Sequence, residues 1–240
     1  MISDMYYLAD KINKGDDDIY IQTFSEAGTE HIGNGENNED AIETAVFKNY
    51  IYIAISDGAG SSAFAKETSN CCVRAAVDFC KINGIGLFNG DMCDTAKQML
   101  CFVRQSLNRL SARLSADPQE FMCTLMLLAV DTDSKRYTAV HIGDGLFAKT
   151  ENDNTQIISY PENGVTKQYT YMVNSLHFKE HLRIKTGKYV SYNTEFFVAT
   201  DGAFENCNST KQYIDRICNI TDCKGFTDDA TYCIVRPFMI

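Results

Sequence analysis

The sequence predicts an α+β fold in which mostly antiparallel β-sheet is covered by helices. Three observations lead to this prediction. Apolar, β-branched runs of strand length recur along the chain, most clearly at 51–56. Two consecutive stretches between 61 and 114 place apolar residues at helical spacing. After them, short turns rich in Asp, Asn and Gly separate further strand-like runs, as in an antiparallel meander.

The N-terminal half is expected to contain one hairpin and two helices. Residues 1–18 are polar, include three consecutive aspartates, and are expected to form an N-terminal arm. A loop dense in glycine and asparagine is expected at 28–40. Ser61 and Ser62 suit the N-terminal cap of the first helix. The expected elements are strands at 19–27, 41–47 and 51–56, and helices at 61–81 and 91–114.

The C-terminal half is expected to be rich in strands. The segment 159–192 has no clear periodicity, apart from a small hairpin expected around 186–188. No repeat, linker or low-complexity segment divides the chain, so residues 1–240 are expected to form one domain. The expected elements are strands at 122–130, 136–142, 146–150, 155–158, 196–200 and 230–235, and a helix at 209–218.

Composition restricts the partners that the chain can have. A formal net charge of −10 over 240 residues argues against nucleic acid or an anionic membrane as a partner. No apolar run reaches membrane-spanning length, and the N-terminus lacks the basic start and apolar stretch of a signal peptide. The ten cysteines form no Cys-x-x-Cys pair, which predicts reduced thiols that pack in a cytoplasmic protein.

Acidic residues recur where strands end. The strand at 51–56 is apolar throughout and runs directly into Asp57, whose burial would be costly without a compensating charge. Asp201 follows a second such strand, and Asp228 and Asp229 precede the last one. Asp144 also lies beside glycine, but Asp-Gly is common in turns, and we interpret Asp144 as a turn residue. A cluster of carboxylates suits Mg²⁺ or Mn²⁺ rather than zinc.

Six short motifs resemble those of the metal-dependent protein phosphatase 2C family in their order and spacing. The resemblance extends from about residue 24 to residue 235, and each motif is weak when taken alone. A bacterial branch is indicated by Gly28-Thr29-Glu30-His31 and by Pro161-Glu162-Asn163. The motifs are Asn38-Glu39-Asp40-Ala41, Ser56-Asp57-Gly58-Ala59-Gly60, Thr124-Leu125, Ile142-Gly143-Asp144-Gly145, Thr200-Asp201-Gly202 and Asp228-Asp229-Ala230-Thr231.

The resemblance implies a four-layer αββα sandwich, two antiparallel sheets flanked by helices, with two Mn²⁺ or Mg²⁺ ions at one end. By that resemblance Asp57 would bridge both ions, and the Gly58 carbonyl would bind one of them. Asp201 and Asp228 would hold the other ion. Three further residues complete the implied set: Glu39 and Asp40, which would act through water, and Asp229, which stands where relatives often have asparagine.

The implied activity is hydrolysis of phosphoserine or phosphothreonine in a protein substrate, by attack of a metal-activated water and without a further cofactor. Many relatives have a phosphate-gripping arginine where this chain has Gly35, and a proton-donating histidine where it has Ala59. We therefore name His31 as a candidate catalytic residue for phosphate binding or protonation, although a surface or packing role explains a lone histidine equally well.

Other departures bear on the site. Phe121 stands where some bacterial members have an acid for a third ion, with Glu120 adjacent. Lys66 and Arg183 are possible phosphate contacts. The alternative function is a pseudophosphatase, a regulatory module that binds a phosphoprotein without turnover. The sequence predicts neither the particular substrate nor an oligomeric state.

Overall fold

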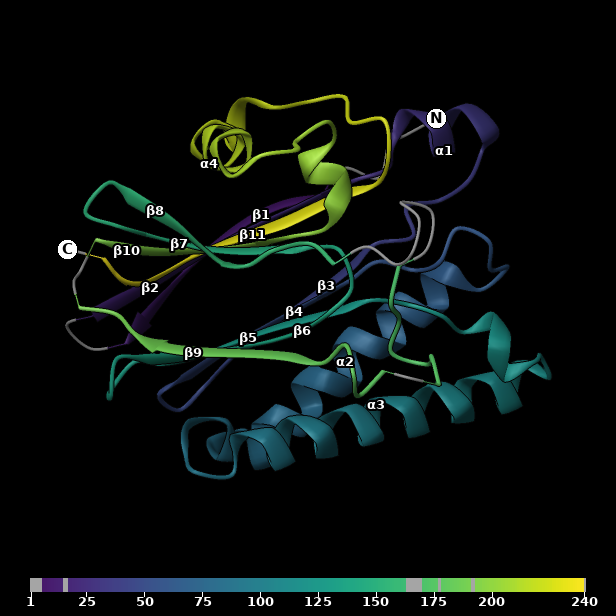
Figure 1. Cartoon of the computed structure of the whole chain (residues 1–240), viewed down its shortest axis with the longest axis horizontal. Helices are drawn as coiled ribbons and strands as arrows, with labels where there is room; N and C mark the ends of the chain where they lie inside the picture. The colour runs from purple at the N-terminus through teal and green to yellow at the C-terminus, as the bar shows by residue number, and fades with distance from the viewer. Residues whose placement is uncertain (1–5, 15–16, 163–169, 177, 191–192, 240) are drawn as a thin grey trace.

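Two antiparallel sheets pack face to face, with helices on the outer side of each (Figure 1). The computed structural model describes residues 6–14, 17–162, 170–176, 178–190 and 193–239. Helices α2 (Ala65–Asn83) and α3 (Met92–Leu114) cover one sheet, and α4 (Thr210–Cys218) covers the other. The predicted four-layer αββα sandwich is therefore confirmed.

The sheet next to α4 has six strands and includes a strand that the sequence analysis missed. We expected residues 1–18 to form an arm, but residues 6–14 form β1 and pair antiparallel with β2, from Tyr6↔Ser25 to Lys14↔Asp17. The prediction was wrong because a polar, lysine-containing segment is also suited to the edge of a sheet. The strands in spatial order are β1 (Tyr6–Lys14), β2 (Asp17–Glu26), β11 (Ala230–Met239), β10 (Thr194–Ala199), β7 (Leu146–Glu151) and β8 (Asn154–Ser159).

The sheet next to α2 and α3 has five strands. The hairpin expected around 186–188 is instead part of a single edge strand, β9, which pairs antiparallel with β6. Gly187 faces Tyr137 across this pair, and a Cβ at Gly187 would lie 2.6 Å from the tyrosine ring. The strands in spatial order are β3 (Ala41–Phe47), β4 (Tyr50–Ser56), β5 (Leu125–Asp131), β6 (Arg136–Ile142) and β9 (Arg183–Lys188).

Strand β4 is buried on both faces, which explains its uninterrupted apolar sequence. Ile51, Ile53 and Ile55 point between the sheets, where they join a cluster with residues of the six-stranded sheet. Tyr52 and Ala54 point the other way, into a cluster with α2 and α3. Because both faces are packed, the end of β4 is a rigid position from which to present Asp57.

A short helix, α1 (Thr29–Asn34), interrupts the segment that we expected to be a loop. It ends at Gly35, whose φ of 75° is left-handed and suits glycine. The N–H groups of Thr29 and Glu30 donate to the carbonyls of Phe226 and Thr227, in the segment before β11. These long-range bonds fix α1 and are not visible in the local sequence.

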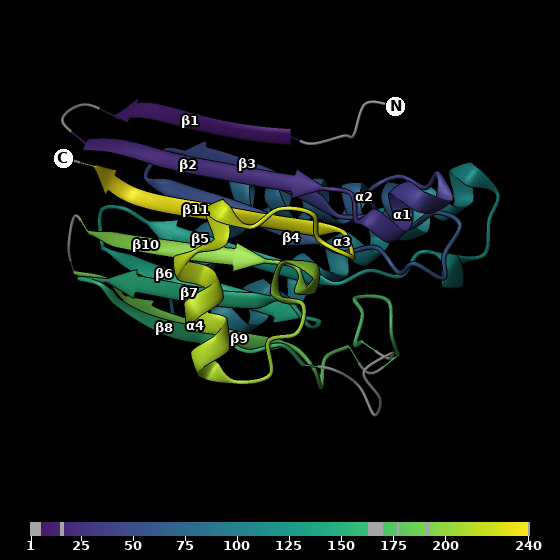
Figure 2. The ribbon, with the colours of Figure 1, turned by 90° about the horizontal axis from the view of Figure 1, so that it is seen from above.

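Short 3₁₀ helices form some of the remaining connections, and α4 lies across the strands of its sheet when the molecule is seen from above (Figure 2). Within the described part of the chain, every helix is too short or too polar to cross a lipid bilayer. The 3₁₀ helices are η1 (Gly84–Phe88), η2 (Pro118–Glu120), η3 (Asp201–Phe204) and η4 (Ile220–Asp222).

Candidate metal centre

Three strands deliver aspartates to one point at the end of the sandwich. Asp57 follows β4, Asp144 lies in the turn after β6, and Asp201 follows β10. One carboxylate oxygen from each lies within 4.8 Å of the others. The first two belong to the five-stranded sheet and the third to the six-stranded sheet, so the cluster forms only when the sheets pack together.

This arrangement is electrostatically unfavourable for the protein alone. Burial, together with the charges of Asp40, Asp201 and Asp144, raises the pKa of Asp57 well above its ordinary value. Part of Asp201 is exposed to solvent, but its carboxyl group is surrounded by protein atoms. This burial and the charges of Asp144 and Asp228 raise its pKa to about 8. A divalent cation would remove this repulsion.

Asp40 adds a buried carboxylate oxygen that the protein leaves unpaired. The residue is 1% exposed, and its Oδ2 accepts a hydrogen bond of 2.7 Å from the Thr200 hydroxyl. Its Oδ1 has no hydrogen-bond partner among the described residues. Burial raises the pKa of Asp40 well above its usual range. An all-oxygen donor set with an orphaned buried oxygen fits a hard cation such as Mn²⁺ or Mg²⁺ and its water shell.

The backbone around Asp57 is held by the segment before β5. The Asp57 N–H donates to Thr124 Oγ1 at 2.9 Å, and the Thr124 N–H donates to the Asp57 carbonyl at 2.9 Å. Gly58 forms an isolated bridge with Cys123. A Cβ at Gly58 would lie 2.4 Å from the Ala65 carbonyl oxygen, so glycine is required for the close approach of α2. The Thr124-Leu125 motif thus positions Asp57.

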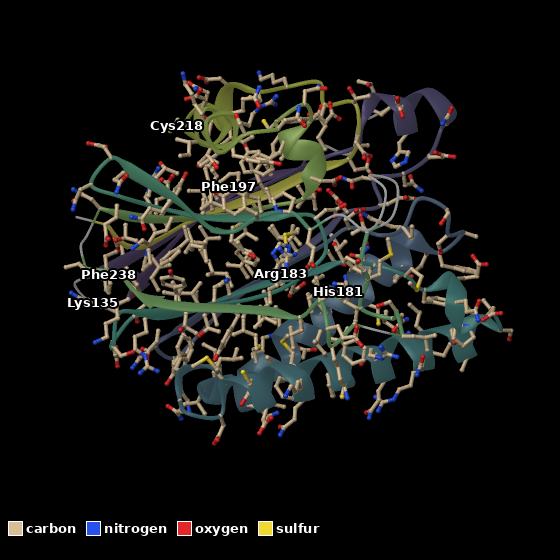
Figure 3. The ribbon with its side chains drawn as sticks, in the orientation of Figure 1. Lys135, His181, Arg183, Phe197, Cys218 and Phe238 are labelled. Carbon is tan, nitrogen blue, oxygen red and sulfur yellow. The ribbon has the colours of Figure 1, made fainter. Side chains whose placement is uncertain are left out.

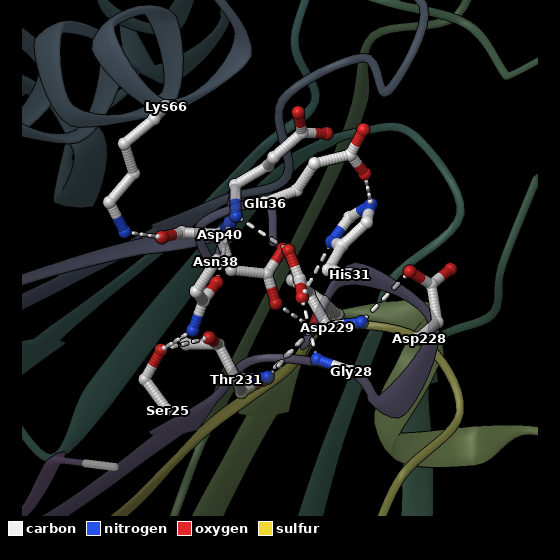
Figure 4. Close-up of polar contacts among 12 residues, drawn as sticks. Ser25, Gly28, His31, Glu36, Asn38, Asp40, Lys66, Asp228, Asp229 and Thr231 are labelled. Carbon is white, nitrogen blue, oxygen red and sulfur yellow. Dashed lines mark hydrogen bonds and ion pairs between the residues drawn. The ribbon is translucent and has the colours of Figure 1, made fainter. Parts of the chain in front are cut away.

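Asp229 binds the protein's own backbone. Its Oδ1 accepts from the Gly28 N–H at 2.7 Å, and its Oδ2 accepts from the Glu39 N–H at 2.5 Å (Figure 4). His31 Nδ1 lies 2.8 Å from Asp229 Oδ1, while His31 Nε2 lies 3.9 Å from Glu36 Oε2. Of the acids predicted to bind metal, Asp229 therefore has its oxygens occupied by the loop between β2 and β3.

Glu39 and Asp228 border the cluster. The Glu39 carbonyl accepts a hydrogen bond of 2.5 Å from Ser69 of α2, and burial raises the pKa of its carboxyl group. Asp228 is exposed, and its Oδ1 accepts from the Asp229 N–H at 2.8 Å. Its charge raises the pKa of Asp57 and of Asp201, which places it near the three-carboxylate cluster.

Asp144, interpreted from the sequence as a turn residue, lies in the turn after β6 and also joins the carboxylate cluster. It is 7% exposed, and burial raises its pKa. Thr170 donates a hydrogen bond to its Oδ2. The signal that could have found it was present, because the strand-then-Asp-Gly pattern of Asp57 and Asp201 recurs at the end of β6.

Arg183 secures the turn that carries Asp144. Its guanidinium group donates to the Gly143 carbonyl, and its Nε lies 3.1 Å from Glu162 Oε2. Glu162 also lies 3.2 Å from His181 Nδ1, and Arg183 and His181 occupy the same end of the sandwich (Figure 3). Arg183, predicted as a possible phosphate contact, thus has acceptors within the protein.

The positions that depart from the resembled family have structural explanations. Gly35 caps α1. The Ala59 N–H donates to the Met122 carbonyl at 2.9 Å. Phe121 is fully buried and stacks on Phe64 with ring centroids 5.2 Å apart, so an aromatic pair occupies this position. Lys66, the other possible phosphate contact, donates to the Asp40 carbonyl at 2.9 Å (Figure 4).

The fold and the acids together define a class: two-sheet α+β sandwiches with a carboxylate centre suited to divalent cations. A sequence model described as protein phosphatase 2C matches residues 27–229. The chain therefore belongs to the protein phosphatase 2C family. No curated protein matches the sequence at a significant level.

Solved structures of a regulatory component of the bacterial T6SS, PppA, and of two serine/threonine phosphatases, Stp1 and PstP, have the same fold. PppA of Pseudomonas aeruginosa aligns with a TM-score of 0.66 at 16% identity, over 95% of this chain and 99% of PppA. Stp1 of Staphylococcus aureus aligns with a TM-score of 0.64 at 12% identity, over 90% and 94%. The catalytic domain of PstP, solved with two manganese ions, aligns with a TM-score of 0.60 at 13% identity, over 91% and 97%.

Proposed function

We propose that this protein is a metal-dependent serine/threonine phosphatase that hydrolyses phosphoserine or phosphothreonine in a protein substrate. The observation that carries the proposal is the convergence of Asp57, Asp144 and Asp201 in a member of this family. Burial and neighbouring carboxylates raise the pKa of each of these groups, so a bound cation would stabilise the centre. A cytoplasmic location stays a prediction from the sequence.

The residues that would hold two Mn²⁺ or Mg²⁺ ions come from both sheets. Asp57, the Gly58 carbonyl, Asp201 and Asp228 are the proposed direct ligands, and Asp144 joins them because of its position in the cluster. When bound, the ions would supply charge neutralisation and an activated water for attack on phosphorus. Glu39 and Asp40 would contribute through water, and Asp229 would contribute by holding the loop that carries them.

The protein's own part is to fix these groups before substrate arrives. Thr124 holds the backbone of Asp57, and Thr200 holds one oxygen of Asp40. Such preorganisation is effective for phosphoryl transfer, where positioning and electrostatic stabilisation do most of the catalytic work.

The proposal is tested by hydrolysis of p-nitrophenyl phosphate and of a phosphothreonine peptide. We expect release of phosphate with added Mn²⁺ and a loss of at least about a hundredfold when a chelator removes the ion, because several kcal/mol of transition-state stabilisation come from the metal. Equal rates with and without the chelator would contradict the proposal.

A pseudophosphatase is the second candidate because this chain lacks the basic side chains that many relatives use to bind phosphate. The family's arginine and histidine positions are Gly35 and Ala59, and the two basic residues considered as replacements, Lys66 and Arg183, contact protein carbonyls. Metal binding by calorimetry without turnover of several phosphopeptides is the result that this alternative predicts.

His31 is the basic side chain that we propose for phosphate contact. Burial lowers its pKa, but the hydrogen bond to Asp229 and the charges of Asp229, Glu39 and Asp228 raise it overall. Its Nδ1 is engaged by Asp229, so any contact with phosphate would use Nε2.

We expect His31→Ala to raise KM for p-nitrophenyl phosphate by about fivefold, the effect of losing one charge-assisted hydrogen bond of about 1 kcal/mol. His31→Asn is the matched variant, because its amide can still donate to Asp229 while offering no group at the Nε2 position. If His31→Asn restored the wild-type KM, the role of His31 would be to hold the loop.

A further inference from the structure

A groove lies between α2 and α3 on the side away from the sheets. It has a volume of about 560 Å³ and follows one face of α2 from Lys66 to Asp78. Its apolar lining includes Cys71, Ala75, Phe102 and Leu110. A channel with an apolar lining and charged margins is suited to an extended peptide rather than to a small ion.

The groove is basic in a protein that is strongly acidic overall. Lys66, Arg74 and Arg113 line it, whereas the whole chain carries a formal net charge of −10. Asp78, at the other end, is already paired with Lys81 at 3.1 Å, so Glu67 is the acid of the lining that has no ion pair among the described residues.

Arg74 and Arg113 are available for a partner. Both are exposed, and neither makes a hydrogen bond or an ion pair within the described part of the chain. Burial raises the pKa of the half-buried Cys71 thiol, and the guanidinium groups of Arg113 and Arg74 both oppose this rise. The two cations on different helices therefore lie near the same point of the groove.

The basic end of the groove adjoins the acidic centre. Lys66 donates to the Asp40 carbonyl at 2.9 Å, and Ser69, one turn further along α2, donates to the Glu39 carbonyl at 2.5 Å. A peptide in the groove would thus reach the loop that carries Glu39 and Asp40 without crossing another element.

We propose that this groove binds an acidic segment of the phosphoprotein substrate, close in sequence to the phosphorylated residue. The inference rests on the proposed function. Two unpaired guanidinium groups complement carboxylates. A local basic surface would also reduce the electrostatic repulsion between a phosphoprotein and a protein of net charge −10.

Two phosphothreonine peptides test the proposal, one with four glutamates beside the phosphothreonine and one with alanine and serine in their place. We expect Arg74→Glu/Arg113→Glu to raise KM for the acidic peptide about tenfold, since two surface ion pairs are replaced by repulsion. KM for the neutral peptide should change less than about twofold. For each peptide, the change in KM is compared with the change in KM that the same variant shows for p-nitrophenyl phosphate.

Arg109→Glu/Lys211→Glu is the matched control. Arg109 is exposed on α3 but does not line the groove, and Lys211 is exposed on α4, across the molecule. This double variant has the same net charge as the groove variant. If it raised KM for the acidic peptide as much as the groove variant does, the effect would be one of net charge and the proposal would be overturned.

Binding of a fluorescent, unphosphorylated hexaglutamate peptide separates this proposal from the proposed function. We expect the groove variant to bind it about fivefold more weakly than wild type and the control variant, and the binding to weaken with salt. Such binding in a protein without turnover would support the groove and reject the phosphatase. No binding to wild type, or equal binding to both variants, would overturn the groove.

Discussion

Asp57→Asn is expected to lower kcat for p-nitrophenyl phosphate by about a hundredfold to a thousandfold while the protein stays folded. Asp57 would be a direct ligand of the proposed ions, and an amide would be a weaker, neutral ligand in its place. Asparagine cannot ionise, so the change also removes the cost of the burial and repulsion that raise the pKa of Asp57, and the metal-free protein should become more stable at neutral pH.

Activity, calorimetric metal binding and thermal unfolding check this prediction together. The matched control is Asp215→Asn, an equal chemical change at an exposed position on α4. We expect the control to retain full activity. An Asp57→Asn protein that keeps most of its turnover would show that the reaction does not use this centre.

The metal-free protein should lose stability as pH rises from about 4 to about 8. Asp201 has a folded-state pKa of about 8 against an ordinary value of 3.8. Below pH 4 both states hold the proton; between these values the unfolded chain releases it and the folded protein does not. Stability contributed by the protonated form is therefore fully present at low pH and lost once pH exceeds about 8.

Thermal unfolding of chelated protein at several pH values measures this loss. For a chain of this size, each 1 kcal/mol lost at the midpoint should lower Tm by about 2–4 °C. Added Mn²⁺ should raise Tm most at pH 8, where the carboxylates are ionised. Other groups also titrate in this range, so the wild-type protein is compared with Asp201→Asn. The fall of Tm with pH between pH 5 and 8 should be less steep for Asp201→Asn. Parallel slopes for the two proteins would contradict the assignment.

The parts of the fold that could be predicted from the sequence are those fixed by local pattern. The isoleucines of β4 define a strand buried on both faces, and the helical stripes of α2 and α3 define the layer on its sheet. The family motifs supplied what pattern alone could not, the packing of two sheets that brings Asp57 and Asp201 together.

The parts that escaped prediction depend on contacts between distant segments. The charged composition of β1 is compatible with an arm or an edge strand, and only pairing with β2 decides. Helix α1 is fixed by carbonyls that lie about two hundred residues further along the chain. Asp144 has the local sequence of an ordinary turn, and its place in the cluster depends on the fold of the whole sandwich. The division into one domain stays a prediction.

The bonds made by Asp229 have a consequence for the affinity of the centre. Asp229 ties Gly28, His31 and the backbone of Glu39 together through protein contacts alone. The loop bearing Glu39 and Asp40 is therefore ordered by folding itself. The loss of conformational entropy, which costs about 1–2 kcal/mol for each ordered residue, occurs during folding and not during ion binding. Because binding of an ion does not order this loop, less of the interaction energy is offset by lost entropy, and the affinity for the ion is higher.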